Sequence, residues 1–245
     1  MGMDEEAQRS PRSLPVRTAD AISRRIASGE WAPGARLPAE PALAESLGVS
    51  RATVRSALRR LAEAGAVRIR HGTGTFVSEH GGAIRASLQS LRSTSQLIRD
   101  QGHEFEIRYR HRTLRAATEA EAGRLRRSSL PVVLDYERAF LGRRSALAFE
   151  SGVIAADGLP VGTDAEALTG SIFEFLEPLG MLPDQSLTHV RATHDPDLAW
   201  GERRPATPLY LTLEQTQFLP SGTAVSWSAT HFVQDQFDFT LIRAA

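Results

Sequence analysis

Residues 36–58 read RLPAEPALAESLGVSRATVRSAL, and this stretch decides the fold of the N-terminal part of the chain. Its first half places Leu43, Ala44 and Leu47 on one apolar stripe, as in a short helix. Gly48 follows, and glycine readily adopts the left-handed conformation that ends a helix. Ser50 then stands where the hydroxyl of an N-cap satisfies the free amides of the next helix. The stretch therefore predicts two short helices joined by a tight turn.

The second helix has an apolar face and an exposed basic start. The apolar positions are Val54, Ala57, Leu58 and Leu61. This spacing leaves Arg51, Thr53 and Arg55 in solvent. In a helix-turn-helix, the second helix enters the major groove with its first residues on bases and phosphates, where the planar fork of arginine bonds two acceptors. From the two helices alone, an ordinary helical hairpin with solvated arginines remains a comparable alternative.

The residues after the second helix favour the DNA-binding interpretation. Residues 66–70 alternate like a strand, residues 71–74 form a glycine-containing turn, and residues 75–78 return. A small hairpin behind a recognition helix is a wing, and glycine at its tip lets the backbone approach DNA closely. We therefore expect a winged helix-turn-helix DNA-binding domain over residues 14–78.

This region resembles the winged-helix domain of the GntR superfamily of bacterial transcriptional regulators. The resemblance rests on LPAE at 37–40, VSRATVR at 49–55, the spacing from Leu61 to Gly65, and HGTGTFV at 71–77. Several motifs in the right order are more specific than any single one. The resemblance implies operator contacts from Arg51, Thr53, Arg55 and Gly72. The full set of expected DNA-binding residues is Arg36, Glu40, Ser50, Arg51, Thr53, Arg55, His71, Gly72 and Gly74.

One position departs from the family. GntR regulators usually carry an arginine directly after the glutamate of the LPAE-like motif, and that arginine touches DNA, whereas this chain has Pro41. Either the contact is absent here or a neighbour such as Arg36 replaces it.

Composition places the chain among ordinary proteins with room for two domains. It has 245 residues, 41% of them hydrophobic and 24% charged, as in globular proteins. No run of apolar residues is long enough to span a membrane, and the start lacks a signal peptide. The absence of cysteine excludes disulfides and thiolate metal sites and fits a cytoplasmic protein. Residues 1–78 carry 12 Arg and 8 acidic residues, and the rest of the chain carries 17 Arg and 21 acidic residues. The net charges of the two parts are therefore +4 and −4.

The second part of the chain has the residue pattern of a β-sheet. Glycines at 81–82 mark a linker over 79–87, and a second domain is expected over 88–245. Helical patterns cover 88–101, 119–125 and 171–177. Strands are expected at 104–112, 132–141, 147–154, 208–218, 224–233 and 237–242. Their period-two alternation predicts an antiparallel α+β domain with one buried face.

This second domain resembles the UTRA effector domain of the HutC branch of GntR regulators. The motifs are STS at 93–95, YERAF at 136–140, LAFE at 147–150, SIFEFL at 171–176, and Trp227 with DQFDFTL at 235–241. That domain is similar in fold to chorismate lyase and binds small metabolites in a cleft beside its sheet. The overall fold class is therefore α+β, with a winged helix-turn-helix followed by an antiparallel-sheet effector domain.

The resemblance also implies which residues hold an effector. In relatives that sense sugar phosphates, hydroxyls at a helix start and two strand arginines hold the phosphate. Ser93 and Ser95 match the hydroxyls, although simple N-capping is an equal alternative. Arg138 matches the first arginine, Phe140 replaces the second, and Glu150 matches a glutamate that bonds ligand hydroxyls or amines. The late family glutamate is Ser226, and the family tyrosine is Phe232.

The expected effector is less charged than a sugar phosphate. Losing the second arginine removes a bidentate clamp, which matters most for phosphate, so we expect a partly apolar metabolite, such as a monoanion. The histidines show no metal-ligand spacing, and we expect no metal, cofactor or catalytic residue.

The sequence thus predicts a ligand-responsive transcription factor, most often a repressor in this branch, that binds a two-fold double-stranded operator as a homodimer. The alternative is an enzyme of the chorismate-lyase type with an accessory DNA-binding module. No nucleophile–base pair supports that alternative. A GntR regulator with an all-helical C-terminal domain is a third possibility, which the alternating strands argue against.

Overall fold

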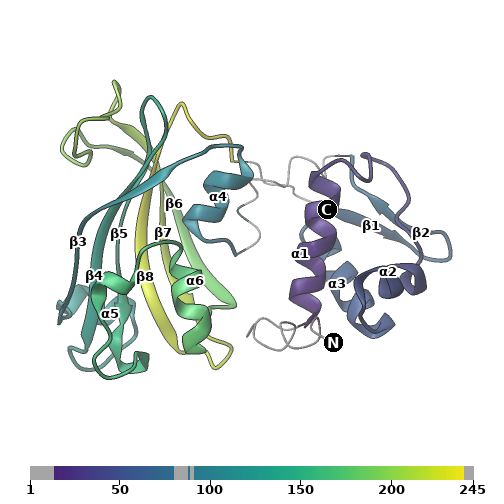
Figure 1. The fold of residues 1–245 in the computed structure, drawn as a ribbon, viewed down its shortest axis with the longest axis horizontal. Coiled ribbons are helices and arrows are strands. Elements are labelled where there is room, and N and C mark those ends of the chain that lie inside the picture. The colour runs from purple at the N-terminus through teal and green to yellow at the C-terminus, as the bar shows by residue number, and fades with distance from the viewer. Residues whose placement is uncertain (1–13, 80–87, 89–90, 240–245) are drawn as a thin grey trace. The chain divides into compact units, whose positions relative to one another are not determined.

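The computed structural model describes residues 14–79, 88 and 91–239 (Figure 1). The chain divides into two units, one that contains residues 14–79 and another that contains Leu91–Phe237. The expected linker, apart from Glu79, lies outside the described residues.

The N-terminal unit contains the predicted helix-turn-helix. Its elements are α1 (Leu14–Ala27), α2 (Glu40–Leu47), α3 (Arg51–Glu63), β1 (Val67–Arg70) and β2 (Gly74–Val77). Gly48 ends α2 with a φ of 63°, and the Ser50 hydroxyl caps α3 by accepting from Thr53 N at 3.1 Å. Both local features were expected from the residue types.

The core of this unit comes from all three helices and the wing. Ile22, Leu43 and Val54 are fully buried. The other buried residues include the predicted Ala57, Leu58 and Leu61, with Val67 and Val77 from the wing. The wing is an antiparallel pair in which Val67 lies opposite Val77, and Val77 N donates to Ala35 O at 2.8 Å, which ties the wing to the chain before α2.

The C-terminal unit is an antiparallel sheet of six strands in the order β3-β4-β5-β8-β7-β6. The strands are β3 (Glu106–Ala116), β4 (Val132–Leu141), β5 (Ala146–Ala155), β6 (Gln185–His194), β7 (Leu209–Phe218) and β8 (Ala224–Val233). The antiparallel α+β fold class is as predicted.

Short helices cover both faces of this sheet. They are α4 (Thr94–Asp100), α5 (Glu119–Arg124) and α6 (Ile172–Leu176), with single turns η3 (Ala156–Gly158), η4 (Ala165–Ala167) and η5 (Glu177–Leu179). The inner face, defined here by Tyr136, Arg138 and Glu150, packs against α6 through Ile172 and Phe173. The outer face packs against the α5 end through Leu125. Figure 1 shows α5 and α6 close to the same end of the sheet.

Two sequence-based expectations about this unit were wrong in detail, and one strand was missed. The helix expected over 88–101 begins only at Thr94, because Ser93 is its N-cap. Residues 237–239 do not form the expected last strand, whose remainder lies outside the described residues. Strand β6 was not predicted. It is an edge strand whose apolar Leu187 and Val190 are each 50% exposed, so it lacks the alternation of a half-buried strand.

Candidate DNA interface and effector site

Three exposed arginines follow one another along α3. Arg51, Arg55 and Arg59 are spaced four residues apart and therefore lie on the same side of the helix. The opposite side is buried in the core of the unit. Arg59 was not among the residues predicted from the sequence, although its spacing from Arg55 could have indicated it. Together the three side chains give α3 a basic stripe suited to a phosphate backbone or to guanine edges.

Arg55 is held in place by Glu40 from the start of α2. Its Nε donates to both carboxylate oxygens at 3.2 Å, and its Nη2 donates to Glu40 Oε2 at 2.8 Å. The hydrogen bond from Arg55 lowers the pKa of Glu40, and the nearby charges of Arg59 and Arg51 add to this effect. Glu40, which was expected as a DNA contact, is in the structure the partner that orients Arg55.

The wing glycines differ in what their conformation requires. Gly72 has a φ of 72° with open space where a side chain would begin, so only its backbone conformation demands glycine. At Gly74, with φ 121°, an added Cβ would lie 2.8 Å from Arg36 Nε. The Arg36 guanidinium therefore rests against the wing at Gly74, and His71 of the wing turn is exposed. Pro41 occupies the exposed first turn of α2.

The strand residues expected to hold an effector lie on the inner face of the sheet. Register pairs Arg138 with Glu150 and Glu150 with Thr230. It also pairs Phe140 with Ala148 and Ala148 with Phe232, while Ser226 lies opposite Ile154. Residues directly opposite one another share a face in an antiparallel sheet. The sheet therefore brings together Arg138, Phe140, Glu150, Ser226 and Phe232, although they come from three strands.

A buried ion pair lies at the centre of this face. Arg138 is 0% exposed and Glu150 is 2% exposed. Arg138 Nη2 donates to Glu150 Oε1 at 3.0 Å, and Nη1 donates to the carbonyl of Gly170 at 2.6 Å and to Tyr109 Oη at 3.2 Å. Burial opposes the charge of Arg138, but the Glu150 carboxylate raises the pKa of the guanidinium. The guanidinium thus stays charged, and both side chains of the pair are withdrawn from solvent.

Two tyrosines that were not predicted as site residues form hydrogen bonds with the ion pair. Tyr136 Oη donates to Glu150 Oε1 at 2.9 Å, and burial raises its pKa well above the ordinary value, so it stays a neutral donor. Burial also raises the pKa of Tyr109. Gly152 makes room for Tyr136, because a Cβ there would lie 2.5 Å from Tyr136 Oη. The alternation of Tyr136 with Arg138 along β4 could have indicated that they share a face.

The start of α4 packs on this face, but its serines differ. Ser93 caps the helix by accepting from Gln96 N at 3.2 Å, which is the N-capping alternative considered from the sequence. Thr94 Oγ1 lies 3.3 Å from Thr230 Oγ1, next to Glu150 in the register. Ser95 is 0% exposed, and among the described residues its hydroxyl has no hydrogen-bond partner.

The remaining predicted residues are packed by aromatic and polar neighbours. The Arg138 guanidinium lies over the Phe140 ring at 4.9 Å, and Phe140 meets Phe105 edge-on at 5.4 Å. Phe232 packs edge-on against Phe237 at 4.9 Å. Ser226 donates its hydroxyl hydrogen to Gln217 Oε1. Ser226 is therefore already satisfied by β7.

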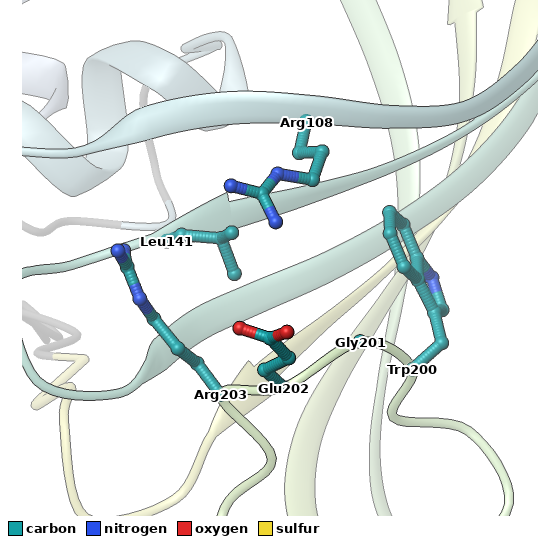
Figure 2. Close-up of a pocket in the computed structure, with 6 residues that line it drawn as sticks. All are labelled: Arg108, Leu141, Trp200, Gly201, Glu202 and Arg203. Carbon is teal, nitrogen blue, oxygen red and sulfur yellow. The ribbon is translucent and has the colours of Figure 1, made fainter.

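Two hollows in the C-terminal unit lie away from the ion pair. One, of about 40 Å³, is lined by Arg108, Leu141, Trp200, Gly201, Glu202 and Arg203 (Figure 2). The register places Arg108 and Leu141 on the outer face. This hollow has room for a few waters at most. The other, a shallow depression of about 530 Å³, lies beside His103, Glu104, Arg143 and Arg144. Neither is lined by the predicted effector residues.

Within the described ranges, no cluster of three or more His, Asp or Glu side chains could hold a metal ion. No helix in that part of the chain combines the length and apolar character needed to cross a membrane.

The geometry of the N-terminal unit defines a winged helix-turn-helix DNA-binding domain. Residues 15–77 match the family of bacterial regulatory proteins of the gntR type, so the chain carries a GntR-family DNA-binding domain, as the sequence motifs predicted.

One similar protein matches over a quarter of the chain, and another matches over nearly the whole chain. The chain is 47% identical to the HTH-type transcriptional regulator Mce2R of Mycobacterium tuberculosis over 68 residues, which is 28% of either chain. Thus the chain spans under a third of that relative. It is 27% identical to the HTH-type transcriptional repressor NagR of Bacillus subtilis over 236 residues, 95% of each chain. Both relatives are named as transcriptional regulators.

A solved structure supports the fold of the whole chain. The possible transcriptional regulator YydK of Bacillus subtilis superposes with a TM-score of 0.70, covering 95% of this chain and all of YydK at 20% identity. The fold of both units is therefore shared with YydK.

Proposed function

We propose that this protein is a ligand-responsive bacterial transcription factor, and that it represses its target genes. The observation that carries the proposal is the basic stripe of Arg51, Arg55 and Arg59, presented by a recognition helix whose other side is core. The full-length similarity to NagR, a transcriptional repressor, supports the sign of regulation. Such a protein acts on chromosomal DNA in the cytoplasm.

The recognition surface is expected to use each predicted residue in a defined way. Arg51 and Arg55 bond base edges and phosphates, and Arg36 with the backbone of Gly72 and Gly74 follows the groove beside them. Ser50 and Thr53 are connected by their hydroxyls at 2.8 Å, so their oxygens remain close to the helix start. His71 adds a polar group at the wing tip.

A homodimer on a two-fold operator follows from the size of this surface. One recognition helix reads only a few base pairs, and specific affinity requires two half-sites about one helical turn apart. Two copies of the chain would present two such helices. Because the two copies are related by two-fold symmetry, the two half-sites are inverted copies of each other.

The C-terminal unit is proposed to bind the effector on the inner face of its sheet. The residues involved are Ser93, Ser95, Arg138, Phe140, Glu150, Ser226 and Phe232. A small molecule can release DNA only if it has different affinities for the DNA-competent and DNA-incompetent states. The polar groups around Arg138 are enclosed here, so binding must displace at least one contact that covers them.

The test is selection of duplexes from a random-sequence library by the full chain at fixed salt, followed by sedimentation of the complex. The proposal requires a two-fold symmetric motif to be enriched and two chains to occupy one duplex. A protein that enriches no motif, or that binds as a single chain, contradicts it. Salt must be fixed because phosphate contacts make affinity strongly salt-dependent.

A further inference from the structure

The inner face of the sheet contains buried polar atoms that no described residue satisfies. They are Arg138 Nε, Glu150 Oε2 and Arg112 Nε, and Ser95 Oγ is a further such atom on α4, whose start packs on this face. Arg138, Glu150 and Ser95 are 0%, 2% and 0% exposed. Buried polar atoms without a partner are rare in folded proteins, because each costs about 1–3 kcal/mol. Two of them on directly paired residues, Arg138 Nε and Glu150 Oε2, are a signal of a missing partner molecule.

The unsatisfied atoms differ in chemistry. Arg138 Nε carries a hydrogen and can only donate, whereas Glu150 Oε2 can only accept while the carboxylate is ionised. The other carboxylate oxygen, Oε1, receives both Arg138 Nη2 and Tyr136 Oη. A single bound molecule that satisfies both atoms must therefore present an acceptor to the guanidinium and a donor to the carboxylate.

The charge of the site selects among such molecules. Arg138 and Glu150 cancel each other, and the buried Tyr136 is neutral. Arg112, another arginine on the inner face, is already paired with Glu166. A ligand with a net charge would be buried without a counter-charge, which is costly in a low-dielectric interior. The monoanion expected from the sequence balances the charge of Arg138, but the structure pairs that charge with Glu150.

We infer that the effector is a net-neutral zwitterion, with an anionic group for Arg138 Nε and a cationic amine for Glu150 Oε2, as in a free amino acid. Hydrogen bonds between ionised groups are shorter and stronger than those between neutral ones. That difference favours a zwitterion over a neutral amide of similar shape. Phe140 supplies an apolar surface beside the guanidinium. This inference rests on the proposed function and specifies the ligand class of the same site.

The contact most readily exchanged for ligand is the one to the Gly170 carbonyl. That carbonyl accepts from Arg138 Nη1 at 2.6 Å and from Tyr109 Oη at 3.4 Å. It lies between η4 and α6, in a segment also held by Arg112, which donates to the carbonyl of Leu168 at 2.7 Å. A carboxylate is a stronger acceptor than a backbone carbonyl and can replace it on the guanidinium.

The experiment compares four charge forms that share each side chain. Free L-amino acids, N-acetyl amino acids, amino acid amides and N-acetyl amino acid amides are zwitterionic, anionic, cationic and neutral. Binding of each to the full chain, without DNA, is measured by thermal shift and calorimetry. For at least one side chain, the zwitterion is expected to bind about tenfold or more tightly than its three counterparts.

Two variants test the assignment of the partner atoms. Glu150→Gln leaves Arg138 without its counter-charge, so the preferred form should change from the zwitterion to the N-acetyl anion. Ser95→Ala keeps the charges and should weaken the zwitterion without changing the order of the four forms. If Glu150→Gln does not fold, the order measured on the unaltered chain still decides between the ligand classes.

The results separate this inference from the proposed function. Tighter binding of the anionic, cationic or neutral series to the unaltered chain, or binding of no series, overturns the zwitterion. Operator affinity is measured separately by fluorescence anisotropy. A chain that binds a zwitterion but never binds an operator supports the ligand class and contradicts the transcription-factor proposal.

Discussion

The guanidinium of Arg138 and the carboxylate of Glu150 form an ion pair across neighbouring strands, 3.0 Å apart, with both side chains only 1% exposed. Such a pair is costly to break from one side, because the remaining charge stays buried without its partner. The pair is therefore both a structural element of the effector unit and, by our proposal, part of the surface that recognises its ligand.

Arg138→Met is expected to destabilise the C-terminal unit by about 3–5 kcal/mol, the usual cost of leaving a buried charge unpaired. Adding Glu150→Leu should restore much of this loss, since no uncompensated charge remains. Chemical denaturation of the single and the double variant, monitored by circular dichroism, measures both changes in stability. The control is Arg191→Met, which removes an exposed partner of Glu214 at 3.7 Å and should cost about 1 kcal/mol or less. Equal losses for Arg138→Met and Arg191→Met would contradict the buried pair.

Glu40→Gln tests whether Glu40 positions Arg55. The change frees Arg55 and removes a negative charge beside the phosphates, so binding to random-sequence DNA should tighten while the preference for the operator falls. Fluorescence anisotropy at fixed salt measures affinity for the operator duplex and for a random-sequence duplex, and the ratio of the two affinities gives the operator preference. Glu45→Gln, an exposed change on the same helix, serves as the control. A Glu40→Gln variant with undiminished operator preference would show that the pair does not orient Arg55.

Pro41→Arg tests the missing family contact. Pro41 is exposed in the first turn of α2, so an arginine there can reach a phosphate without disturbing the core. We expect tighter operator binding and a salt dependence of affinity that is steeper by about one phosphate contact. An unchanged slope would mean that Arg36, which rests on the wing at Gly74, already neutralises that phosphate.

Glu121 predicts an acid-sensitive contribution to stability. It accepts from Arg115 through both oxygens at 2.8 Å and from Thr118 N at 2.8 Å, and these bonds, led by those from Arg115, lower its pKa to about 2. Because the pKa is lower in the folded than in the unfolded chain, the unfolded state binds more protons in the window between the two values. The stabilisation is therefore complete above about pH 4.5 and is lost as the pH falls to about 2.

The measurement is urea unfolding of the protein and of Glu121→Gln across this pH range. The variant should be less stable by on the order of 1–3 kcal/mol at about pH 7, and the difference should shrink steadily as the pH approaches about 2. Glu119→Gln, an exposed change in the same short helix, should show no such convergence. A difference between Glu121→Gln and the unaltered protein that stays constant with pH would contradict the assignment.

Local sequence signals predicted the N-terminal unit well. Gly48 and Ser50 determine the turn through their own backbone preferences, and the apolar spacing around Val54 determines which side of α3 is buried. These effects act over a few residues and are readable without the fold. The pairing of Arg55 with Glu40 was not readable, because it depends on the angle between two helices.

The effector site was predictable only in part. Arg138 and Glu150 were identified through resemblance to a family, and the alternation along β4 and β5 was enough to place them on strands. Their direct pairing depends on the strand register, and the contact with Gly170 depends on a loop far away in the sequence. Strand β6 escaped prediction because an exposed edge strand has little apolar alternation.

The central claim is that α3 reads DNA through its exposed arginines, and Arg51→Ala tests it most directly. Arg51 is exposed at the start of α3 and belongs to no part of the core, so the variant should fold and melt like the unaltered protein. Arg143→Ala is the matched control, because it removes an 87%-exposed arginine from the other unit. The account predicts that operator affinity, measured by anisotropy at fixed salt, falls at least about tenfold for Arg51→Ala and stays unchanged for Arg143→Ala. Unchanged affinity in Arg51→Ala, or an equal loss in both variants, would contradict it.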